Sequence, residues 1–321
     1  MVSTEDVRAA YRWILGREAE NEEVISHHAR LSASVEDLRR KFLCSPEFVQ
    51  NARGLHSPQR FLDLPPIEVD VDASSEQLAK MIRHIESNWQ RLGICDPHWS
   101  VFAIEAFRAS NIARTRKEFY DSGLLDVMGL QRTAERCGVD LTKFKRCFEL
   151  GCGVGRMTVW LADLFERVAA ADISRAHLAL AKEALDTFSK GNVDLIHVDT
   201  FDAFHALPKF DFFCSLIVLQ HNPPPLIAVL LRTLLNELRP GGIAYFQVPT
   251  YQSGYGFRIE EYILNASPTR GMEMHLIPQS QLFDILDRSG CKVLECREDL
   301  WTGDYNVTSN SIFAKKKEIT A

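Results

Sequence analysis

Three glycines stand on alternate positions between an apolar segment and a helix-like segment. They are Gly151, Gly153 and Gly155, and Glu149 precedes them near the end of the apolar segment. Glycine has no Cβ, so its backbone can approach a ligand closely and can adopt turn angles that other residues reach only at a cost. A strand, a tight glycine turn and a helix start are the arrangement by which a Rossmann-type sheet binds a nucleoside cofactor.

The spacing of these glycines separates two classes of cofactor. A dinucleotide-binding fold has the pattern G-x-G-x-x-G, and Arg156 occupies the position of its last glycine here, which disfavours a pyrophosphate. An acidic residue ahead of G-x-G-x-G suits a ligand with an amino group and no phosphates. S-adenosylmethionine is such a ligand. The predicted cofactor contacts in this loop are Glu149, Gly151, Cys152, Gly153, Gly155 and Arg156.

Acidic residues also end the next two predicted strands. Asp172 lies about 20 residues beyond the glycines, where this fold holds the diol of a ribose. Asp199 ends the following strand, and the residues behind it can face an adenine ring. A buried strand over residues 210–219 comes next. We therefore expect further cofactor contacts from Asp172, Ile173, Asp199, Thr200, Phe201, Leu219 and Gln220.

Taken in order, these segments resemble the class I S-adenosylmethionine-dependent methyltransferases. The resemblance covers roughly the last two-thirds of the chain and includes Leu238-Arg239-Pro240-Gly241-Gly242. It implies an α/β fold with a Rossmann-like, mostly parallel sheet of seven strands whose last strand is antiparallel. It also implies S-adenosyl-L-methionine as cofactor and S-adenosyl-L-homocysteine as product. The alternative is a Rossmann-like domain that holds a different ligand.

The first 54 residues have the pattern of three short amphipathic helices. Ser3, Asn21 and Ser34 can each cap a helix, and Gly16 can end the first one. The segment 11–17, together with Ser45-Pro46-Glu47-Phe48, resembles a small helical module of unknown function at the front of bacterial enzymes. Those enzymes often build or decorate surface glycans. The resemblance implies an all-α accessory module that contacts a partner or a substrate, by fold-level analogy.

The rest of the chain divides into three predicted parts. Residues 55–76, which are rich in proline and acidic residues, indicate a linker or an edge strand. Residues 77–138 have helical spacing, and we expect them to form a cap over the cofactor cleft. Residues 139–321 form the predicted catalytic domain. Within the cap, Trp99 and Tyr120 stand among polar groups and are candidate substrate contacts, although core packing is the commoner role of such aromatics.

The reaction implied by this cofactor needs alignment more than covalent chemistry. A sulfonium methyl group is a strong electrophile, so the enzyme must place donor, methyl and acceptor in line. A hydroxyl acceptor loses its proton during transfer, and histidine is the natural base. His221 is a candidate because it stands at a strand's carboxyl end, and His275 because its segment can reach over the site. The alternative interpretation of His221 is a structural residue that orders the turn, and that of His275 is an ordinary loop histidine.

Two further motifs leave alternatives open. Asn222-Pro223-Pro224-Pro225 is similar to the Asn-Pro-Pro-aromatic motif of N-methyltransferases that act on adenine or glutamine, but Pro225 replaces the stacking aromatic. The segment 251–258 joins glycines to Tyr251, Tyr255 and Arg258, which could bind a sugar or an anionic group or could simply pack against the cap. No compact set of metal ligands is present, although ligands could converge from distant segments.

Composition narrows the function further. The chain has 321 residues, a net charge of −6, 46% hydrophobic residues and 25% charged residues, which are ordinary values for a globular protein. The acidic balance argues against a nucleic-acid partner. No signal-like start and no apolar run long enough to span a membrane are present, so we expect a cytoplasmic protein. The eight cysteines are scattered, as expected for thiols in a reducing compartment.

The sequence therefore predicts an S-adenosylmethionine-dependent O-methyltransferase. We expect direct in-line transfer to a sugar hydroxyl of a bacterial surface glycan or its precursor, and hence a role in polysaccharide biosynthesis. The alternatives are a methyltransferase for a small natural product and a regulatory protein that binds S-adenosylmethionine without turnover.

Overall fold

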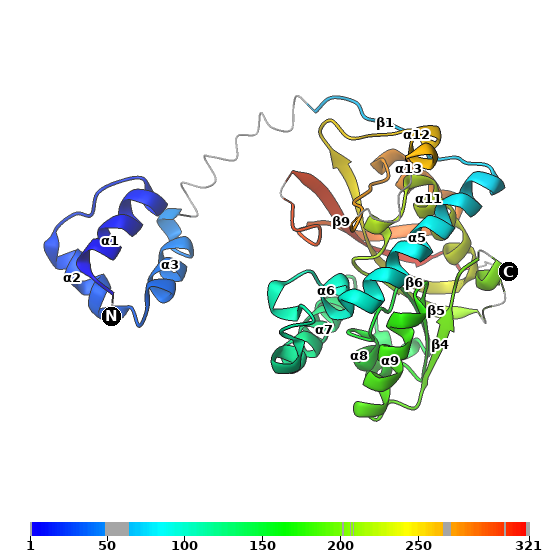
Figure 1. The fold of residues 1–321 in the computed structure, drawn as a ribbon, viewed down its shortest axis with the longest axis horizontal. Helices are drawn as coiled ribbons and strands as arrows, with labels where there is room; N and C mark the ends of the chain where they lie inside the picture. Colours follow the sequence, from blue (N-terminus) through cyan, green and yellow to red (C-terminus); the bar gives the residue numbers. More distant parts are fainter. Residues whose placement is uncertain are drawn as a thin grey trace. The chain divides into compact units, whose positions relative to one another are not determined.

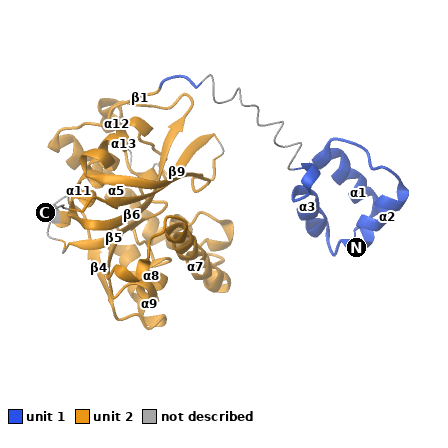
Figure 2. Ribbon diagram, turned by 180° about the vertical axis from the view of Figure 1, so that it is seen from behind, with its two compact units in different colours: residues 1–66 blue, residues 67–321 orange. Residues whose placement is uncertain are grey.

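The computed structural model describes residues 2–48, 64–200, 202–205, 207, 209–265, 271–304 and 306–318. The chain forms two compact units, residues 1–66 and residues 67–321 (Figure 2). Among the described residues, no helix combines the length and the apolar character that crossing a membrane requires. Phe201, one of the predicted adenine contacts, lies outside the described residues.

The first unit is helical, and its three helices begin where the sequence predicts. The side chains of Ser3, Asn21 and Ser34 each accept a hydrogen bond from a backbone N–H of the first turn. Such caps satisfy donors that have no partner within the helix. The apolar sides meet in a small core around Tyr11 and Phe42. The elements are α1 (Thr4–Ala10), the π-helical turn η1 (Tyr11–Leu15), α2 (Glu22–Leu31) and α3 (Val35–Leu43).

The second unit contains a seven-stranded sheet in the order β4-β3-β2-β5-β6-β9-β8 (Figure 1). The pairs from β4 through β6 are parallel, and β9 runs antiparallel to both β6 and β8. The predicted α/β class and the antiparallel last strand are thus confirmed. The strands are β2 (Arg146–Leu150), β3 (Arg167–Asp172), β4 (Val193–His197), β5 (Phe210–Ser215), β6 (Leu238–Gln252), β8 (Cys291–Asp299) and β9 (Val307–Lys316).

Both faces of this sheet are covered by helices, because successive side chains of a strand point to opposite faces. In β5, Phe213 belongs to one core cluster, whereas Phe212 and Cys214 belong to another. Helices α11 and α13 pack in the first cluster, and α7 and α8 pack in the second. The helices after β2 are α8 (Thr158–Leu164), α9 (Arg175–Thr187), α10 (Asp202–His205), α11 (Pro224–Glu237), α12 (Ile259–Leu264) and α13 (Gln279–Arg288).

The segment expected to form one cap divides between two positions. Helix α5 (Ser75–Cys95) and the short α6 (Pro97–Val101) contribute side chains to the cleft described below. Helix α7 (Ile112–Arg136), reached through the 3-10 turn η3 (Glu105–Phe107), instead packs Val127 and Leu130 against the sheet. The 3-10 turn η4 (Leu141–Lys143) then leads into β2.

A second, two-stranded sheet connects the start of this unit to the segment after β6. Strand β1 (Glu68–Val69) pairs in parallel with β7 (Gly256–Phe257). Arg258 forms ion pairs with Glu68 and Asp70, which strengthens the same connection. Two residues of the acidic segment thus form a short strand, while its assignment as a linker stays a prediction.

Helix α7 approaches the glycine loop so closely that one of its own positions must be glycine. A Cβ built on Gly123 would lie 2.1 Å from the carbonyl oxygen of Arg156. Gly129 lies on the same helix, and a Cβ there would meet nothing within 4 Å. Backbone atoms cannot move aside as a flexible side chain can, so this contact sets the distance between α7 and the loop.

We predict opposite effects of alanine at these two glycines. Gly123→Ala should lower the free energy of unfolding by about 1–3 kcal/mol through overpacking. Gly129→Ala should raise it by up to about 1 kcal/mol, because alanine favours the helix. Chemical denaturation of both variants measures the difference. Equal stabilities would show that α7 does not hold the loop in this way.

Candidate functional site

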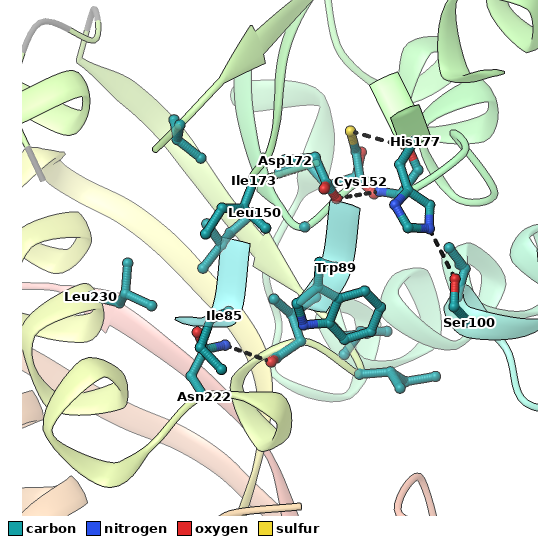
Figure 3. A pocket seen from close by; sticks show the side chains of 18 of the residues that line it. Ile85, Trp89, Ser100, Leu150, Cys152, Asp172, Ile173, His177, Asn222 and Leu230 are labelled. Carbon is teal, nitrogen blue, oxygen red and sulfur yellow. Dashed lines mark hydrogen bonds between the residues drawn. The ribbon is translucent and has the colours of Figure 1, made fainter. Parts of the chain in front are cut away.

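A cleft opens at the carboxyl ends of the parallel strands, beside the place where the strand order reverses at β2. Ligands of open α/β sheets bind at such switch points. The cleft encloses about 1030 Å³, part of it open to solvent. Figure 3 shows Asp172 and Cys152 on one side and Trp89 of α5 on another. Its apolar walls include Ile82, Ile85, Trp89, Val101, Ile173, Val198, Phe204, Leu226 and Leu230.

The glycine loop is held by backbone hydrogen bonds to the end of β3. The N–H groups of Gly151 and Cys152 donate to the Ala171 carbonyl at 2.7 and 3.0 Å. Gly151 and Gly153 have φ values of 73° and 54°, which favour glycine. A Cβ on Gly151 would lie 2.4 Å from a methyl group of Val218, a residue of the cleft wall. The loop can therefore line the cleft only because its glycines have no side chains.

Glu149 places a buried carboxyl group on the cleft wall. It is 5% exposed, and its Oε2 accepts a hydrogen bond from the Thr158 hydroxyl at 2.7 Å. Burial raises the pKa of Glu149 to about 7, against the opposing effects of Thr158 and the Arg156 charge. A cationic ligand group would favour the ionised form. In the free protein, the stability linked to this group is present below about pH 4.5 and is lost as pH rises through about 7.

Arg156 lines the cleft, but its charge is already paired. Its guanidinium lies 2.6 Å from an Asp126 oxygen, and it donates to the Ser122 hydroxyl at 3.1 Å. It also stacks over the ring of Phe102, 4.8 Å from the centroid. Burial raises the pKa of Asp126, and the Arg156 charge acts against that shift. Arg156 therefore links α7, through Asp126, and the residue after α6, through Phe102, to the loop.

The other predicted cofactor contacts divide into two groups. Asp172 and Ile173 line the cleft together with Gly151, Cys152 and Gly153. The remaining described ones are not among the lining residues. These are Gly155, Asp199, Thr200, Leu219 and Gln220. Contact with a cofactor stays a prediction for both groups.

His221, a predicted base, is buried in the 3-10 turn η5 (Leu219–His221) rather than on the cleft wall. Its Nδ1–H donates to the Glu273 carbonyl at 2.7 Å, because a carbonyl can only accept. Its Nε2 then accepts from the Gln220 amide at 3.2 Å. Burial lowers the pKa of His221 to about 4. The ring is thus neutral near pH 7, and both of its nitrogens are engaged.

His275, the second predicted base, belongs to a polar cluster centred on Glu273. The Glu273 carboxylate lies 3.1 Å from His275 Nε2 and 3.1 Å from His84 Nε2, and it accepts from the Tyr262 hydroxyl at 2.7 Å. His275 Nδ1 lies 2.9 Å from the Tyr255 hydroxyl. Burial would raise the pKa of Glu273, but these hydrogen bonds outweigh it and lower the pKa to about 2. The cluster holds the segment after β6 against α5 and α12.

The five predicted substrate contacts are not among the lining residues of the cleft either. Trp99 packs under the guanidinium of Arg108, 3.6 Å from the ring centroid. Tyr120 is buried, and its hydroxyl donates to the Val154 carbonyl at 3.2 Å, which supports the glycine loop from behind. Tyr255 contacts His275, and Arg258 is ion-paired with Glu68. A role in acceptor binding stays a prediction for these four and for Tyr251.

Several residues on the cleft wall were missed by sequence reasoning. Ile82, Ile85 and Trp89 recur at helical spacing, which predicts one apolar side of a helix but not what that side faces. His177 is a further omission: it is 1% exposed and lines the cleft. Its Nε2–H donates to Ser100 at 2.9 Å, while its buried Nδ1 has no hydrogen-bond partner among the described residues. Burial lowers the pKa of His177, so its ring is neutral.

Cofactor affinity should depend on the ionisation of Glu149. Because the pKa of Glu149 is about 7, roughly a tenth of these carboxyl groups are ionised at pH 6 and most are ionised at pH 8. We expect S-adenosylhomocysteine, which retains an ammonium group, to bind up to roughly 10-fold more tightly at pH 8 than at pH 6. Calorimetric titration over this range checks it. Glu149→Gln should remove the pH dependence, and an unchanged slope in that variant would contradict the assignment.

A pair of glycine variants tests the loop itself. Gly151→Ala should abolish binding of S-adenosylhomocysteine, because its Cβ would collide with the cleft wall. Gly138→Ala is the matched control, since Gly138 also has a positive φ of 66° but a Cβ there meets nothing within 4 Å. Both variants should lose on the order of 1–2 kcal/mol of stability from backbone strain. Equal binding by both would show that the loop does not contact the cofactor.

Comparison with known proteins agrees with this geometry. Residues 148–242 match the family described as "Methyltransferase domain". Over 108 residues the chain is 31% identical to "Methyltransferase GfsG" from Streptomyces halstedii. The aligned region covers 32% of this chain and 37% of that protein. The match therefore spans little more than a third of the length of this curated relative.

Solved structures with a similar fold include magnesium protoporphyrin IX methyltransferase (ChlM) from Synechocystis PCC 6803 with bound SAH. The TM-score is 0.45 at 18% identity, over 68% of this chain and 99% of that one. The [4+2]-cyclase SpnF gives 0.45 at 16% identity, over 79% of this chain and 100% of that one. The family match therefore assigns residues 148–242 of this chain to a methyltransferase domain.

Proposed function

We propose that this protein is an O-methyltransferase that transfers the methyl group of S-adenosylmethionine directly to a hydroxyl group of a small acceptor. The observation that carries this proposal is one cleft with two unlike parts. One part has the glycine loop, Glu149 and Asp172, and the other is an apolar wall from α5 and α11. A binding site of this kind orients a ligand through a few polar groups and encloses it with apolar ones.

The polar part of the cleft fits the cofactor. The loop brings bare backbone to the cleft wall, and Glu149 offers a carboxyl group for an ammonium group. Asp172 lies on the same wall and would hold ribose hydroxyls. When bound, S-adenosylmethionine supplies an electrophilic methyl group. The chain's own residues hold both reactants in place and exclude water, and such positioning can supply much of the rate acceleration.

The apolar part suggests the class of acceptor. Ile82, Ile85 and Trp89 of α5 face the cleft, as do Leu226 and Leu230 of α11. This wall favours a hydroxylated natural product with an apolar surface. Asn222 is a polar group on the cleft wall, and its Nδ2 donates to the Val218 carbonyl at 2.9 Å. Its carbonyl oxygen is thus suited to accept a hydrogen bond from the acceptor hydroxyl.

A sugar hydroxyl of a glycan precursor is the second candidate. The Trp89 indole supports it, because an aromatic ring on a cleft wall can stack against the C–H face of a sugar. The resemblance of the first unit to a module of glycan-modifying enzymes points to the same acceptor. Under either candidate, we propose that His221 and His275 position the turn after β5 rather than remove the proton, because their ring nitrogens are engaged.

The test is turnover of S-adenosylmethionine with two acceptor panels, hydroxylated apolar compounds and nucleotide-linked sugars. Formation of S-adenosylhomocysteine together with an acceptor heavier by one methylene group would support the proposal. The acceptor panel that reacts decides between the two candidates. Binding of the cofactor without turnover on either panel would instead favour a regulatory protein that binds S-adenosylmethionine.

Trp89 should contribute to acceptor binding. Trp89→Ala removes a large apolar surface from the cleft wall, and we expect the KM for the acceptor to rise on the order of 10-fold. Trp13→Ala is the matched control, because Trp13 is 87% exposed in the first unit. Steady-state kinetics on the reactive acceptor measures both. An unchanged KM in the Trp89→Ala enzyme would show that the acceptor does not contact this apolar wall.

A further inference from the structure

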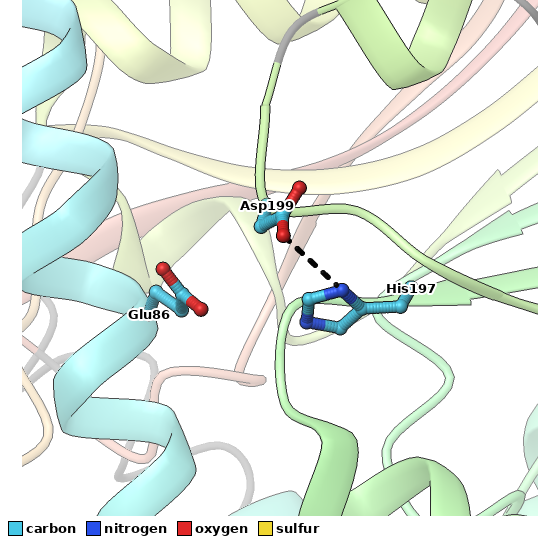
Figure 4. A group of neighbouring side chains, drawn as sticks. All are labelled: Glu86, His197 and Asp199. Carbon is cyan, nitrogen blue, oxygen red and sulfur yellow. Dashed lines mark ion pairs between the residues drawn. The ribbon is translucent and has the colours of Figure 1, made fainter.

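Three potential ligand groups converge directly behind the cleft wall. They are the carboxylates of Glu86 and Asp199 and the imidazole of His197 (Figure 4). One ligand atom from each lies within 4.8 Å of the other two. Glu86 belongs to α5, His197 ends β4, and Asp199 follows that strand. Distant segments thus meet here, so the three ligands form no compact motif in the sequence.

A backbone carbonyl determines which ring nitrogen of His197 carries a hydrogen. Its Nε2 lies 3.0 Å from the Ile173 carbonyl oxygen, so this nitrogen must carry the proton and donate it. The other nitrogen, Nδ1, lies 3.5 Å from Asp199 Oδ2. In a neutral ring, Nδ1 presents a lone pair to a carboxylate. A histidine that donates one N–H to a carbonyl and points its other nitrogen at carboxylates has the orientation of a metal ligand.

The two carboxylates lack strong partners of their own. No hydrogen bond or ion pair reaches Glu86 from the residues that the structure describes. Besides His197, Asp199 has the Arg175 guanidinium at 3.9 Å, which is beyond hydrogen-bond distance. A lone pair and two carboxylate groups therefore surround one small volume, and their mutual repulsion would be relieved by a cation.

We propose that Glu86, His197 and Asp199 form a site for one divalent transition-metal ion, Zn²⁺, with an open position for water. One imidazole nitrogen and two carboxylate oxygens are a donor set that Zn²⁺ accepts, and three protein ligands with a water are common for it. Asp199 would give the metal Oδ2, the oxygen that lies 3.5 Å from His197 Nδ1. The site is independent of which acceptor is methylated.

Such an ion would fasten α5 to the edge of the sheet. Ile85, next to Glu86, and Val198, between the other two ligands, both line the cleft. The Ile173 carbonyl that orients His197 belongs to a third lining residue. Zn²⁺ bound here fixes the positions of these three lining residues relative to one another. A pre-ordered cleft has a higher affinity for S-adenosylhomocysteine. By linkage, S-adenosylhomocysteine raises the affinity for Zn²⁺ by the same factor.

The test is calorimetric titration of the full chain with Zn²⁺ after treatment with a chelator. We expect one equivalent of Zn²⁺ to bind. Glu86→Gln and His197→Ala should each weaken Zn²⁺ binding by at least about 10-fold, because even loss of a residue that only orients a metal ligand typically costs that much. Glu86→Gln preserves shape, so it guards against misfolding, which circular dichroism also monitors. His27→Gln, an exposed histidine in the first unit, is the control for adventitious binding and should have no effect.

The outcomes separate this proposal from the proposed methyl transfer. Stoichiometric uptake that Glu86→Gln weakens, with tighter S-adenosylhomocysteine binding in the presence of Zn²⁺, supports the site whether or not an acceptor reacts. Absence of saturable uptake would show that the cluster holds only a proton and would overturn the proposal. Uptake that is equal in Glu86→Gln, His197→Ala and wild type would be adventitious and would also overturn it. If Zn²⁺ leaves the affinity for S-adenosylhomocysteine unchanged, the ion does not order the cleft, and that part of the proposal is overturned.

Discussion

The geometry of the site depends on the carboxylate of Asp172. Its two oxygens accept hydrogen bonds at 2.8 Å from the backbone N–H of Gly153 and at 2.8 Å from that of Ser174. One bond fixes the glycine loop after β2, and the other fixes the start of α9, where Ser174 is the N-cap. Charge-assisted bonds of this kind are about twice as strong as neutral ones. Each oxygen keeps a second lone pair, so Asp172 can support the loop and still accept a ribose hydroxyl.

Sequence reasoning predicted the elements whose signals are local. The glycine loop, the helix caps and the buried strand β5 have local signals, and the structure has each of them, although β5 ends at Ser215 rather than at the predicted residue 219. The side to which a helix packs is not a local property. The same apolar periodicity describes α5, which faces the cleft, and α7, which packs on the sheet, so the predicted cap joined two helices with different surroundings. Contacts with the loop distinguish α7 as its support, among them the Arg156 carbonyl against Gly123 and the Arg156–Asp126 ion pair.

The histidines show the same limit for chemistry. Position at a strand end favours His221 as a base, but its tautomer is set by the Glu273 carbonyl, 52 residues away in sequence. Glu273 also orders His84 and His275 through its carboxylate. Its lowered pKa means that the stability it contributes is present above about pH 4.5 and is lost as pH falls toward about 2. One residue thus organises three histidines, and no sequence pattern indicates that a glutamate at this place does so.

Burial around Glu149 connects the free protein to the proposed reaction. In the free protein, an apolar surrounding disfavours its charge and raises its pKa to about 7. A cationic cofactor would reverse this balance, since opposite charges attract more strongly where water is excluded. The same low-polarity cleft would favour transfer of a methyl group from a sulfonium to the acceptor, because the positive charge on sulfur is dispersed as the bond breaks. The apolar walls of this cleft would therefore support cofactor binding before the proposed reaction and charge dispersal during it.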